Sequence, residues 1–107
     1  MVHINVVNSN NADEFKNRRD KGQWFVLFHA EWCGHCKAMK PEWDKLVKNN
    51  TSSINLAEVE SKFIDKNKDS DIHGFPTMKL FTNSKVTDYN YGRDLQSFQK
   101  FLEDNEV

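Results

Sequence analysis

The chain is poor in cysteine, balanced in charge and without a long apolar run, and each of these absences excludes a class of protein. Two cysteines among 107 residues are too few for a small scaffold stapled by several disulfides. Lys and Arg total 15 against 16 Asp and Glu, a net charge of −1, whereas a nucleic-acid-binding protein usually presents a basic face. No apolar stretch approaches the ~20 residues of a membrane-spanning helix. We therefore expect neither nucleic acid nor a membrane as partner.

The two ends of the sequence lack the targeting patterns that are easiest to read. Residues 1–5 have no basic start followed by an apolar stretch, and residues 103–107 are not an endoplasmic-reticulum retention signal. We expect a cytoplasmic location, or the endoplasmic-reticulum lumen if the sequence is a domain excised from a longer precursor. With 37% hydrophobic residues and eight Phe, residues 1–107 are expected to form a single monomeric domain around one core.

Strand-like and helix-like patterns alternate along the chain. Short apolar runs predict strands at 3–7, 24–28, 54–59 and 78–81, and an antiparallel return at 86–91. Apolar residues at three-four spacing predict helices that begin at Ser9 or Asn10, at the cysteine segment and at Asp94. This alternation, followed by a hairpin, predicts an α/β fold with a mixed sheet between helices.

The only two cysteines stand three residues apart, in the segment Trp32-Cys33-Gly34-His35-Cys36 at the expected start of a helix. Free backbone N–H groups and the positive end of the helix dipole favour an anion there. We therefore expect a lowered pKa for Cys33, which makes it the attacking thiolate. Cys36, one turn further in, is expected to be more buried and to release the client from a mixed disulfide at Cys33. His35 adds positive charge that stabilises the reduced form.

The same two cysteines would also suit a metal site, a haem site or a place in the core. A zinc site needs four ligands, and only Cys33, Cys36 and distant histidines are available. A c-type haem needs His directly after the second cysteine, where this chain has Lys37. Two buried core cysteines would have poor core neighbours in Gly34 and His35. Metal or iron–sulfur binding between two subunits is a weaker alternative. We expect no cofactor or metal besides the redox-active pair itself.

Two separate motifs carry a resemblance to a known family. They are Phe28-His29-Ala30-Glu31-Trp32-Cys33-Gly34-His35-Cys36-Lys37, followed by Pro41, and Gly74-Phe75-Pro76-Thr77. The chain resembles the thioredoxin superfamily, and its Cys-Gly-His-Cys form is similar to the catalytic (a-type) domains of protein disulfide isomerase. This resemblance, from about residue 6 to residue 102, implies a thioredoxin-like α/β fold in which four helices flank a central mixed sheet. It also implies a protein thiol–disulfide oxidoreductase, acting as oxidase, isomerase or reductase on protein or peptide clients.

The resemblance implies roles for residues near the cysteines. Pro76 would be a cis-proline that faces the dithiol. Trp32, Gly74 and Phe75 would form an apolar rim for extended or unfolded clients, although a place in the core or in a turn is the alternative. Arg93 would match an arginine that swings toward the second cysteine and lowers its pKa. A solvated arginine beside a helix cap is the alternative for that residue.

Two positions depart from the family pattern. The family usually has a buried acid six residues before the first cysteine, where this chain has Leu27, and a lysine on the neighbouring strand, where it has Glu58. We hypothesise that Glu58 reaches beneath the dithiol and serves Cys36 as general base, with a pKa raised by burial. If Glu58 instead points to solvent, nothing replaces the acid. The alternative for the whole chain is a thioredoxin-fold chaperone or adaptor, a binding module whose redox turnover is slow or absent because Leu27 replaces the acid.

One face of the expected sheet is a further departure. The first and third helices of the fold pack on it, and both are poor in apolar residues here. Arg18 and Arg19 stand where aliphatic residues are common, and the segment 66–71 is almost wholly polar. We expect thin cover on this face and a short or frayed third helix. Most local packing should then come from Phe63, Ile64 and Ile72.

Overall fold

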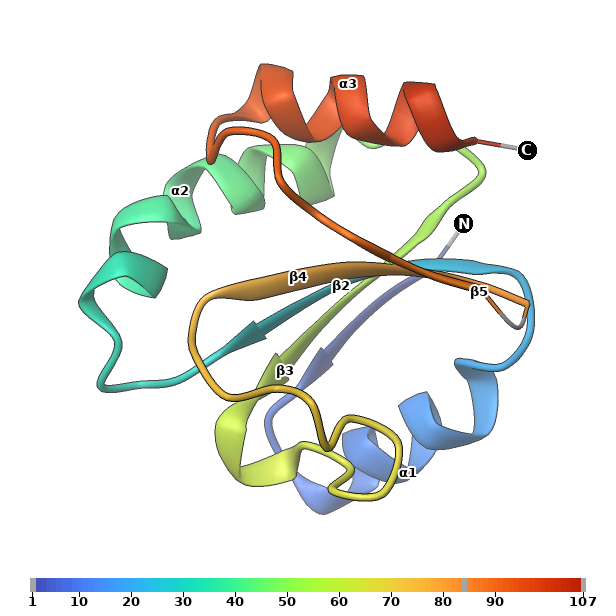
Figure 1. Cartoon of the computed structure of the whole chain (residues 1–107), viewed down its shortest axis with the longest axis vertical. Coiled ribbons are helices and arrows are strands. Elements are labelled where there is room, and N and C mark those ends of the chain that lie inside the picture. The colour runs from blue at the N-terminus through green and yellow to red at the C-terminus, as the bar shows by residue number, and fades with distance from the viewer. Residues whose placement is uncertain (1, 84, 107) are drawn as a thin grey trace.

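The computed structural model describes residues 2–83 and 85–106, and its strands form one mixed sheet with helices on both sides (Figure 1). The elements in chain order are β1 (His3–Val6), α1 (Ser9–Arg18), β2 (Gln23–His29), α2 (Gly34–Asn49), β3 (Asn55–Glu60), the 3-10 helix η1 (Ser61–Phe63), β4 (Thr77–Thr82), β5 (Lys85–Asp88) and α3 (Leu95–Asn105). All five predicted strands are present. The largest shift is in β5, which ends at Asp88 because Tyr89 and Tyr91 turn toward α3 and pack on Phe101.

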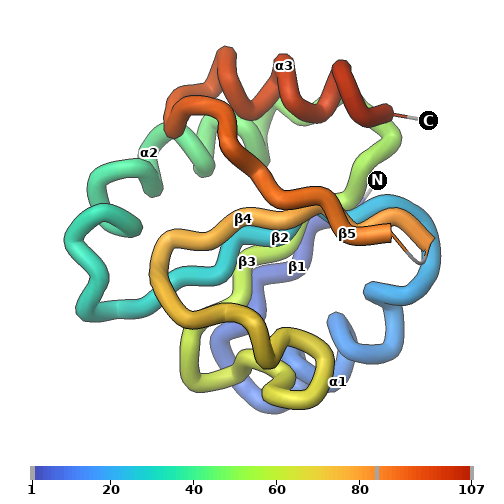
Figure 2. Tube along the Cα trace, in the orientation of Figure 1, coloured from blue at the N-terminus to red at the C-terminus, as the bar shows by residue number. Residues whose placement is uncertain are grey.

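The strands lie in the order β1-β3-β2-β4-β5. β1, β3 and β2 run parallel to one another, and β4 pairs antiparallel with both β2 and β5 (Figure 2). Parallel strands need a crossover, which the helices α1 and α2 provide. Helices α2 and α3 cover one side of the sheet, and α1 lies on the other (Figure 1). We name these sides the α2–α3 face and the α1 face. The predicted α/β arrangement with a mixed sheet is confirmed.

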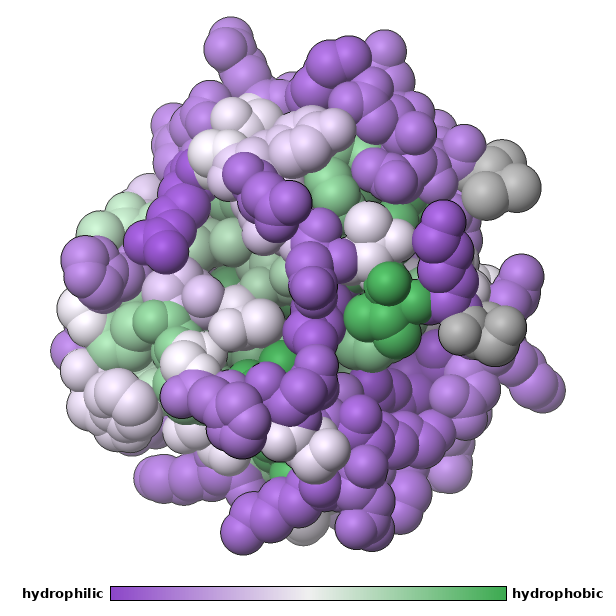
Figure 3. Space-filling model, in the orientation of Figure 1, coloured by the Kyte–Doolittle hydropathy of each residue, from purple (hydrophilic) through white to green (hydrophobic). Residues whose placement is uncertain are grey.

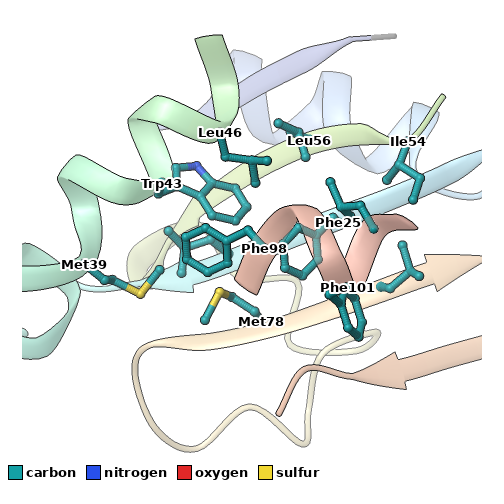
Figure 4. Packing of buried hydrophobic residues seen from close by; sticks show 12 residues of the cluster. Phe25, Met39, Trp43, Leu46, Ile54, Leu56, Met78, Phe98 and Phe101 are labelled. Atoms are coloured by element: carbon teal, nitrogen blue, oxygen red, sulfur yellow. The ribbon is translucent and has the colours of Figure 1, made fainter. Parts of the chain in front are cut away.

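The α2–α3 face carries the larger aromatic core. Side chains alternate along a strand, so every second residue of β2, β3 and β4 points to this face. Trp43 of α2 and Phe98 of α3 have ring centroids 5.7 Å apart, and the Phe25 ring lies 5.4 Å from Trp43 (Figure 4). Burial of each such side chain stabilises the fold by about 2–3 kcal/mol. The buried cluster consists of Phe25, Leu27, Met39, Trp43, Leu46, Ile54, Leu56, Met78, Leu80, Phe98, Phe101 and Leu102.

Helix α1 begins within a residue of the predicted start. Its N-cap is Asn8, whose side-chain oxygen accepts a hydrogen bond from the Asn11 backbone N–H at 2.8 Å. The helix ends four residues before Gly22, which has a φ of 78° and makes the left-handed turn into β2. A residue with a side chain would be strained at that position.

The α1 face carries a smaller apolar cluster. Phe15, the buried residue of α1, meets Trp24 of β2 edge to face with ring centroids 5.4 Å apart. Phe63, Ile64 and Ile72 pack against the cluster while staying partly exposed, so they contribute to the local packing, but the buried residues of the cluster are others. The buried members are Ile4, Val6, Phe15, Trp24, Val26, Phe28, Ala57 and Val59.

The prediction of four flanking helices is wrong, because the described residues contain three α-helices and the short η1. After η1 the chain continues as two successive turns, at residues 66–68 and 70–71. The Asp65 carboxylate accepts the N–H groups of Asn67 and Lys68, and the Asp65 carbonyl accepts that of Asp69. A helix needs an apolar stripe to offset the ordering of its backbone, and this segment has none. The short or frayed third helix that the sequence predicts is thus not formed as an α-helix among the described residues, which have only the 3-10 turn η1 between β3 and β4.

The polar residues on the α1 face do more than the sequence suggests. The sequence predicts that Arg19 leaves this face thinly covered, but its side chain is only 5% exposed. Its guanidinium donates to both carboxylate oxygens of Asp69, at 2.7 and 2.8 Å, and lies over the rings of Phe15 and Phe81. This two-point ion pair ties α1 to the irregular segment that replaces the missing helix.

Candidate active site

Cys33 and Cys36 form a disulfide in the first turn of α2, with Cα atoms 5.3 Å apart. Cys33 is the N-cap of the helix, and its sulfur accepts the Cys36 backbone N–H at 3.1 Å. This is the geometry expected of a sulfur at a helix N-terminus. The two residues are both 5% exposed, so the prediction that Cys36 is the more buried is wrong. Gly34 and His35 lie between them and are exposed.

An aromatic rim stands beside the disulfide. Trp32 is 75% exposed, and its ring meets that of Phe75 edge to face at 5.7 Å. Phe75 also packs on the small cluster of Ala30, Cys33 and Cys36. Figure 3 shows apolar and weakly polar surface gathered on the left of this view, over the loop between β2 and α2, where most other surface is hydrophilic. Trp32 is thus exposed and in contact with Phe75, and the role of Trp32, Gly74 and Phe75 as a rim for clients stays a prediction.

The loop before β4 carries the remaining motif. The Phe75–Pro76 peptide bond is cis, as the resemblance implies. The Gly74 carbonyl accepts the Thr77 hydroxyl at 2.6 Å, which closes the turn. A side chain at Gly74 would meet no atom within 4 Å, so space alone does not require glycine there.

Arg93 lies near Pro76, because both residues line the same pocket. It is exposed and lines a pocket of about 350 Å³ together with Pro76, Thr77, Met78 and residues 88–91. The described pocket at Cys36 is lined by different residues and does not include Arg93. Arg93 therefore shares a hollow with Pro76, and its approach to the second cysteine stays a prediction.

Glu58 is buried on the α2–α3 face, so the alternative that it points to solvent is wrong. It stands opposite Leu27 in the parallel register of β3 and β2, and its side chain is 2% exposed. One carboxylate oxygen accepts from the Lys40 ammonium of α2. The other accepts from His3 Nε2 at 2.7 Å. The buried acid of β3 therefore has a cation from helix α2 and an imidazole from β1 as partners.

The prediction of a raised pKa for Glu58 is wrong. Burial by itself would raise it, but the hydrogen bonds from His3 and Lys40 lower the Glu58 pKa to about 2. Burial likewise works to lower the pKa of Lys40, and its bonds to Asp44 and Glu58 raise it overall. Glu58 is therefore a carboxylate at neutral pH and a weak proton acceptor. Its role as general base for Cys36 stays a prediction that this pKa disfavours.

Sequence reasoning missed two residues at the site. His29 follows Leu27 by two on β2, so strand alternation places both on the same side. Lys40 follows Cys36 by four on α2, which places them on one helix face. These four residues line one pocket of about 150 Å³. The sequence signal for His29 is its place two residues after Leu27 on the strand, and the signal for Lys40 is its place four residues after Cys36 on the helix.

Metal-ligating side chains are not grouped in the described part of the chain. Among residues 2–83 and 85–106, no three His, Cys, Asp or Glu side chains lie together so that they could hold a metal. The helices of the same residues are all too short or too polar to cross a bilayer.

Comparison with known proteins agrees with this geometry. The profile of the Thioredoxin family matches residues 4–104. A thioredoxin domain-containing protein of Theileria parva is 32% identical over an alignment of 103 residues, and the alignment covers 94% of this chain and 47% of that protein. Protein disulfide-isomerase of Gallus gallus is 43% identical over 84 residues, 74% of this chain and 16% of the relative. The chain thus spans less than half the length of these curated relatives.

A solved structure gives the same answer for the fold. The first thioredoxin domain of mouse protein disulfide-isomerase A4 superposes with a TM-score of 0.70 and 28% identity, covering 92% of this chain and 72% of that chain. Taken with the profile match over residues 4–104, it shows that the chain belongs to the thioredoxin family and resembles an a-type domain of protein disulfide isomerase.

Proposed function

We propose that this chain acts on protein or peptide clients as a thiol–disulfide oxidoreductase domain. The observation that carries the proposal is the Cys33–Cys36 disulfide at the first turn of α2, beside the exposed Trp32 and its partner Phe75. The relatives named protein disulfide-isomerase support the same assignment. The disulfide and an exposed aromatic side chain thus lie side by side, which supports exchange with an extended client.

The exchange proceeds in two steps. In the reduced form, the Cys33 thiolate attacks one sulfur of a client disulfide, and the other client sulfur leaves as a thiolate. Cys36, as a thiolate, then attacks Cys33, which breaks the bond to the client and forms the Cys33–Cys36 disulfide. The client gains two electrons and the domain loses two. The reverse sequence oxidises a client dithiol.

The surface around the cis peptide bond suits an extended client. Pro76 lines a pocket of about 350 Å³ on the Arg93 side, and Phe75 lines one of about 410 Å³ beside Ile64 and Ile72. Aromatic side chains beside small hollows are common features of peptide-binding surfaces. We propose that Arg93 contacts the client backbone or side chains in its pocket.

Insulin reduction and the refolding of a disulfide-containing client test the proposal. Cys33→Ser is expected to lower both activities by about 100-fold or more, because Cys36 alone cannot close the disulfide that releases the client. Cys36→Ser is expected to accumulate the mixed disulfide at Cys33, which mass spectrometry detects. A Cys33→Ser variant with full activity would show that binding, and not exchange, accounts for the effect.

The direction of the reaction is decided by the reduction potential of the pair. A value near that of protein disulfide isomerase, about −180 mV, would indicate client oxidation or isomerisation. A value near that of thioredoxin, about −270 mV, would indicate client reduction. Equilibration with defined glutathione or dithiothreitol ratios, followed by thiol alkylation, measures it.

A binding module is the second candidate, and one observation favours it. Leu27 is fully buried where the family has its acid, while Trp32 remains exposed for contact. For such a module, Trp32→Ala would weaken suppression of client aggregation, and Cys33→Ser would leave that suppression unchanged. The two variants therefore separate the candidates in one assay.

A further inference from the structure

A small pocket lies beside Cys36, and Trp32, Phe75 and Pro76 are not among the residues that line it. Its volume is about 150 Å³, and its walls come from the end of β2, the following loop and the first turns of α2. Cys36, the second residue of the disulfide, is one of these walls. A pocket of this size has room for water. The pocket is lined by Leu27, His29, Ala30, Glu31, Cys36, Lys37 and Lys40.

His29 has an unusual state within this group. Its Nε2 atom is buried and has no hydrogen-bond partner among the described residues. Buried polar side-chain atoms are nearly always paired, so an unpaired one calls for a functional or solvent explanation. Strand alternation points His29 to the same face as Leu27, the residue that replaces the family's acid. An imidazole nitrogen thus stands two residues from the position where a proton acceptor is missing.

The charges around His29 come from every element packed against it. Glu58 and Glu60 lie on β3, Glu31 on the loop after β2, and Lys37 and Lys40 on α2. Burial lowers the pKa of His29, Lys40 lowers it further, and the carboxylates, Glu58 first, oppose the change. The imidazole is therefore neutral near neutral pH. A proton that it accepts is compensated by the nearby Glu58 carboxylate.

We propose that His29 accepts the proton of Cys36 across this pocket in the step that releases the client. The inference rests on the proposed function, since it concerns the second step of that exchange. The Cys36 thiol gives its proton to His29 Nε2, directly or through one water. The resulting thiolate forms the bond to Cys33, and the client sulfur leaves with the electron pair of the broken bond. The imidazolium then returns its proton to solvent through the open side of the pocket.

The test isolates the second step by rapid mixing. Reduced protein is mixed with a peptide disulfide, quenched with acid at different times and analysed by mass spectrometry for the mixed disulfide. His29→Gln is expected to slow its decay by about tenfold or more near pH 7. The deficit should shrink above about pH 9, where a thiol loses its proton without help. The rate at which the mixed disulfide forms should be the same within about twofold in the Cys36→Ser variant and in the Cys36→Ser/His29→Gln double variant.

His3→Gln is the matched control, because His3 bonds to the same Glu58 but does not line the pocket. It should leave the decay rate near that of the unaltered protein. Decay in His29→Gln that is unchanged at all pH values would overturn the inference. So would an equal slowing at every pH together with a lowered unfolding midpoint, which indicates a structural role. If Cys36→Ser forms no mixed disulfide at all, the proposed function fails, and that result is distinct from failure of the His29 inference.

Discussion

The two faces of the sheet are held to it by different forces. On the α2–α3 face, two regular helices bury a continuous aromatic cluster that includes Phe25, Trp43, Phe98 and Phe101. On the α1 face, the apolar cluster is smaller, and ionic contacts complete it. Figure 1 shows the contrast directly, with paired helices above the sheet and one helix beside an irregular loop below it.

Three ionic contacts of the α1 face involve the segment between η1 and β4, and two of the three join residues about 50 positions apart. Arg19 bonds to Asp69, the Lys68 ammonium lies 2.8 Å from Asp20, and the buried Lys79 of β4 bonds to Asp71. Each of these contacts reaches the segment between η1 and β4. A loop without an apolar stripe is thus fixed by charge, whereas helices with one are fixed by packing. The two cysteines lie at the start of α2, on the α2–α3 face. A site on a regular, well-packed element keeps a constant geometry, as thiol exchange requires.

The largest expected effect comes from a substitution in the aromatic cluster of the α2–α3 face. Phe98→Ala should lower the free energy of unfolding by about 4 kcal/mol, because Phe98 is fully buried and its removal leaves a cavity. Urea denaturation followed by circular dichroism measures the loss. Phe63→Ala, on the α1 face and only partly buried, is the control and should cost less than about 2 kcal/mol. Equal costs would mean that the two faces do not differ in packing.

The next largest effect comes from breaking the buried Arg19–Asp69 ion pair on the α1 face. Asp69→Ala should cost about 3 kcal/mol, since it leaves the Arg19 guanidinium buried and unpaired. Glu14→Ala removes the exposed Glu14–Arg18 pair and should cost no more than about 0.5 kcal/mol. The double variant Arg19→Leu/Asp69→Leu should be more stable than Asp69→Ala alone. If the Asp69 and Glu14 variants lose the same stability, the buried pair does not hold the loop.

An acid titration examines Glu58, a buried carboxylate on the packed side. The Glu58 pKa is lowered from 4.5 to about 2, so the folded state binds fewer protons than the unfolded state between these values. The associated stabilisation, about 3 kcal/mol, is complete above about pH 4.5 and is lost as the pH falls toward 2.

Glu58→Gln should remove this dependence and cost about 2 kcal/mol at neutral pH. Asp44→Asn, which removes the exposed partner of the same Lys40, is the control and should keep the acid dependence. Unfolding curves at several pH values give both quantities. A Glu58→Gln variant with the same loss of stability below pH 4.5 as the unaltered protein would contradict the assignment.

The smallest expected effect concerns local opening. Amides of residues 62–70 should exchange with solvent at least about tenfold faster than those of β2, which corresponds to about 1.4 kcal/mol of opening free energy. Hydrogen–deuterium exchange read by mass spectrometry or NMR gives the rates. Protection of this segment equal to that of β2 would mean that charge fixes a loop as firmly as packing fixes a strand.

The packed side was the more predictable from sequence. The apolar run of β2 and the three-four spacing of α2 depend on local patterns, and the cysteines mark the start of the helix. The family resemblance indicated the place of the cis peptide bond, which no periodicity reveals. The ends of the elements shifted by a few residues because caps such as Asn8 compete with their neighbours.

The ionic side and the environment of Glu58 were less predictable for a physical reason. Arg19 and Asp69 are 50 residues apart, and a pairing of charges has no period that a sequence can display. The sequence predicts no cation beside Glu58, yet Lys40 approaches it from a helix and His3 from an edge strand. Burial alone indicates the wrong sign for its pKa shift, because the sign depends on partners that only the fold brings together.

The position of Trp32 has a practical consequence. The chain has three tryptophans, and Trp24 and Trp43 are enclosed in the two separate cores, so a dissolved quencher reaches the indole next to Cys33 far more easily than the others. Collisional quenching by acrylamide or iodide therefore lowers mainly the fluorescence of Trp32. The domain carries its own optical label at the mouth of the site, and client arrival can be followed without attaching a dye.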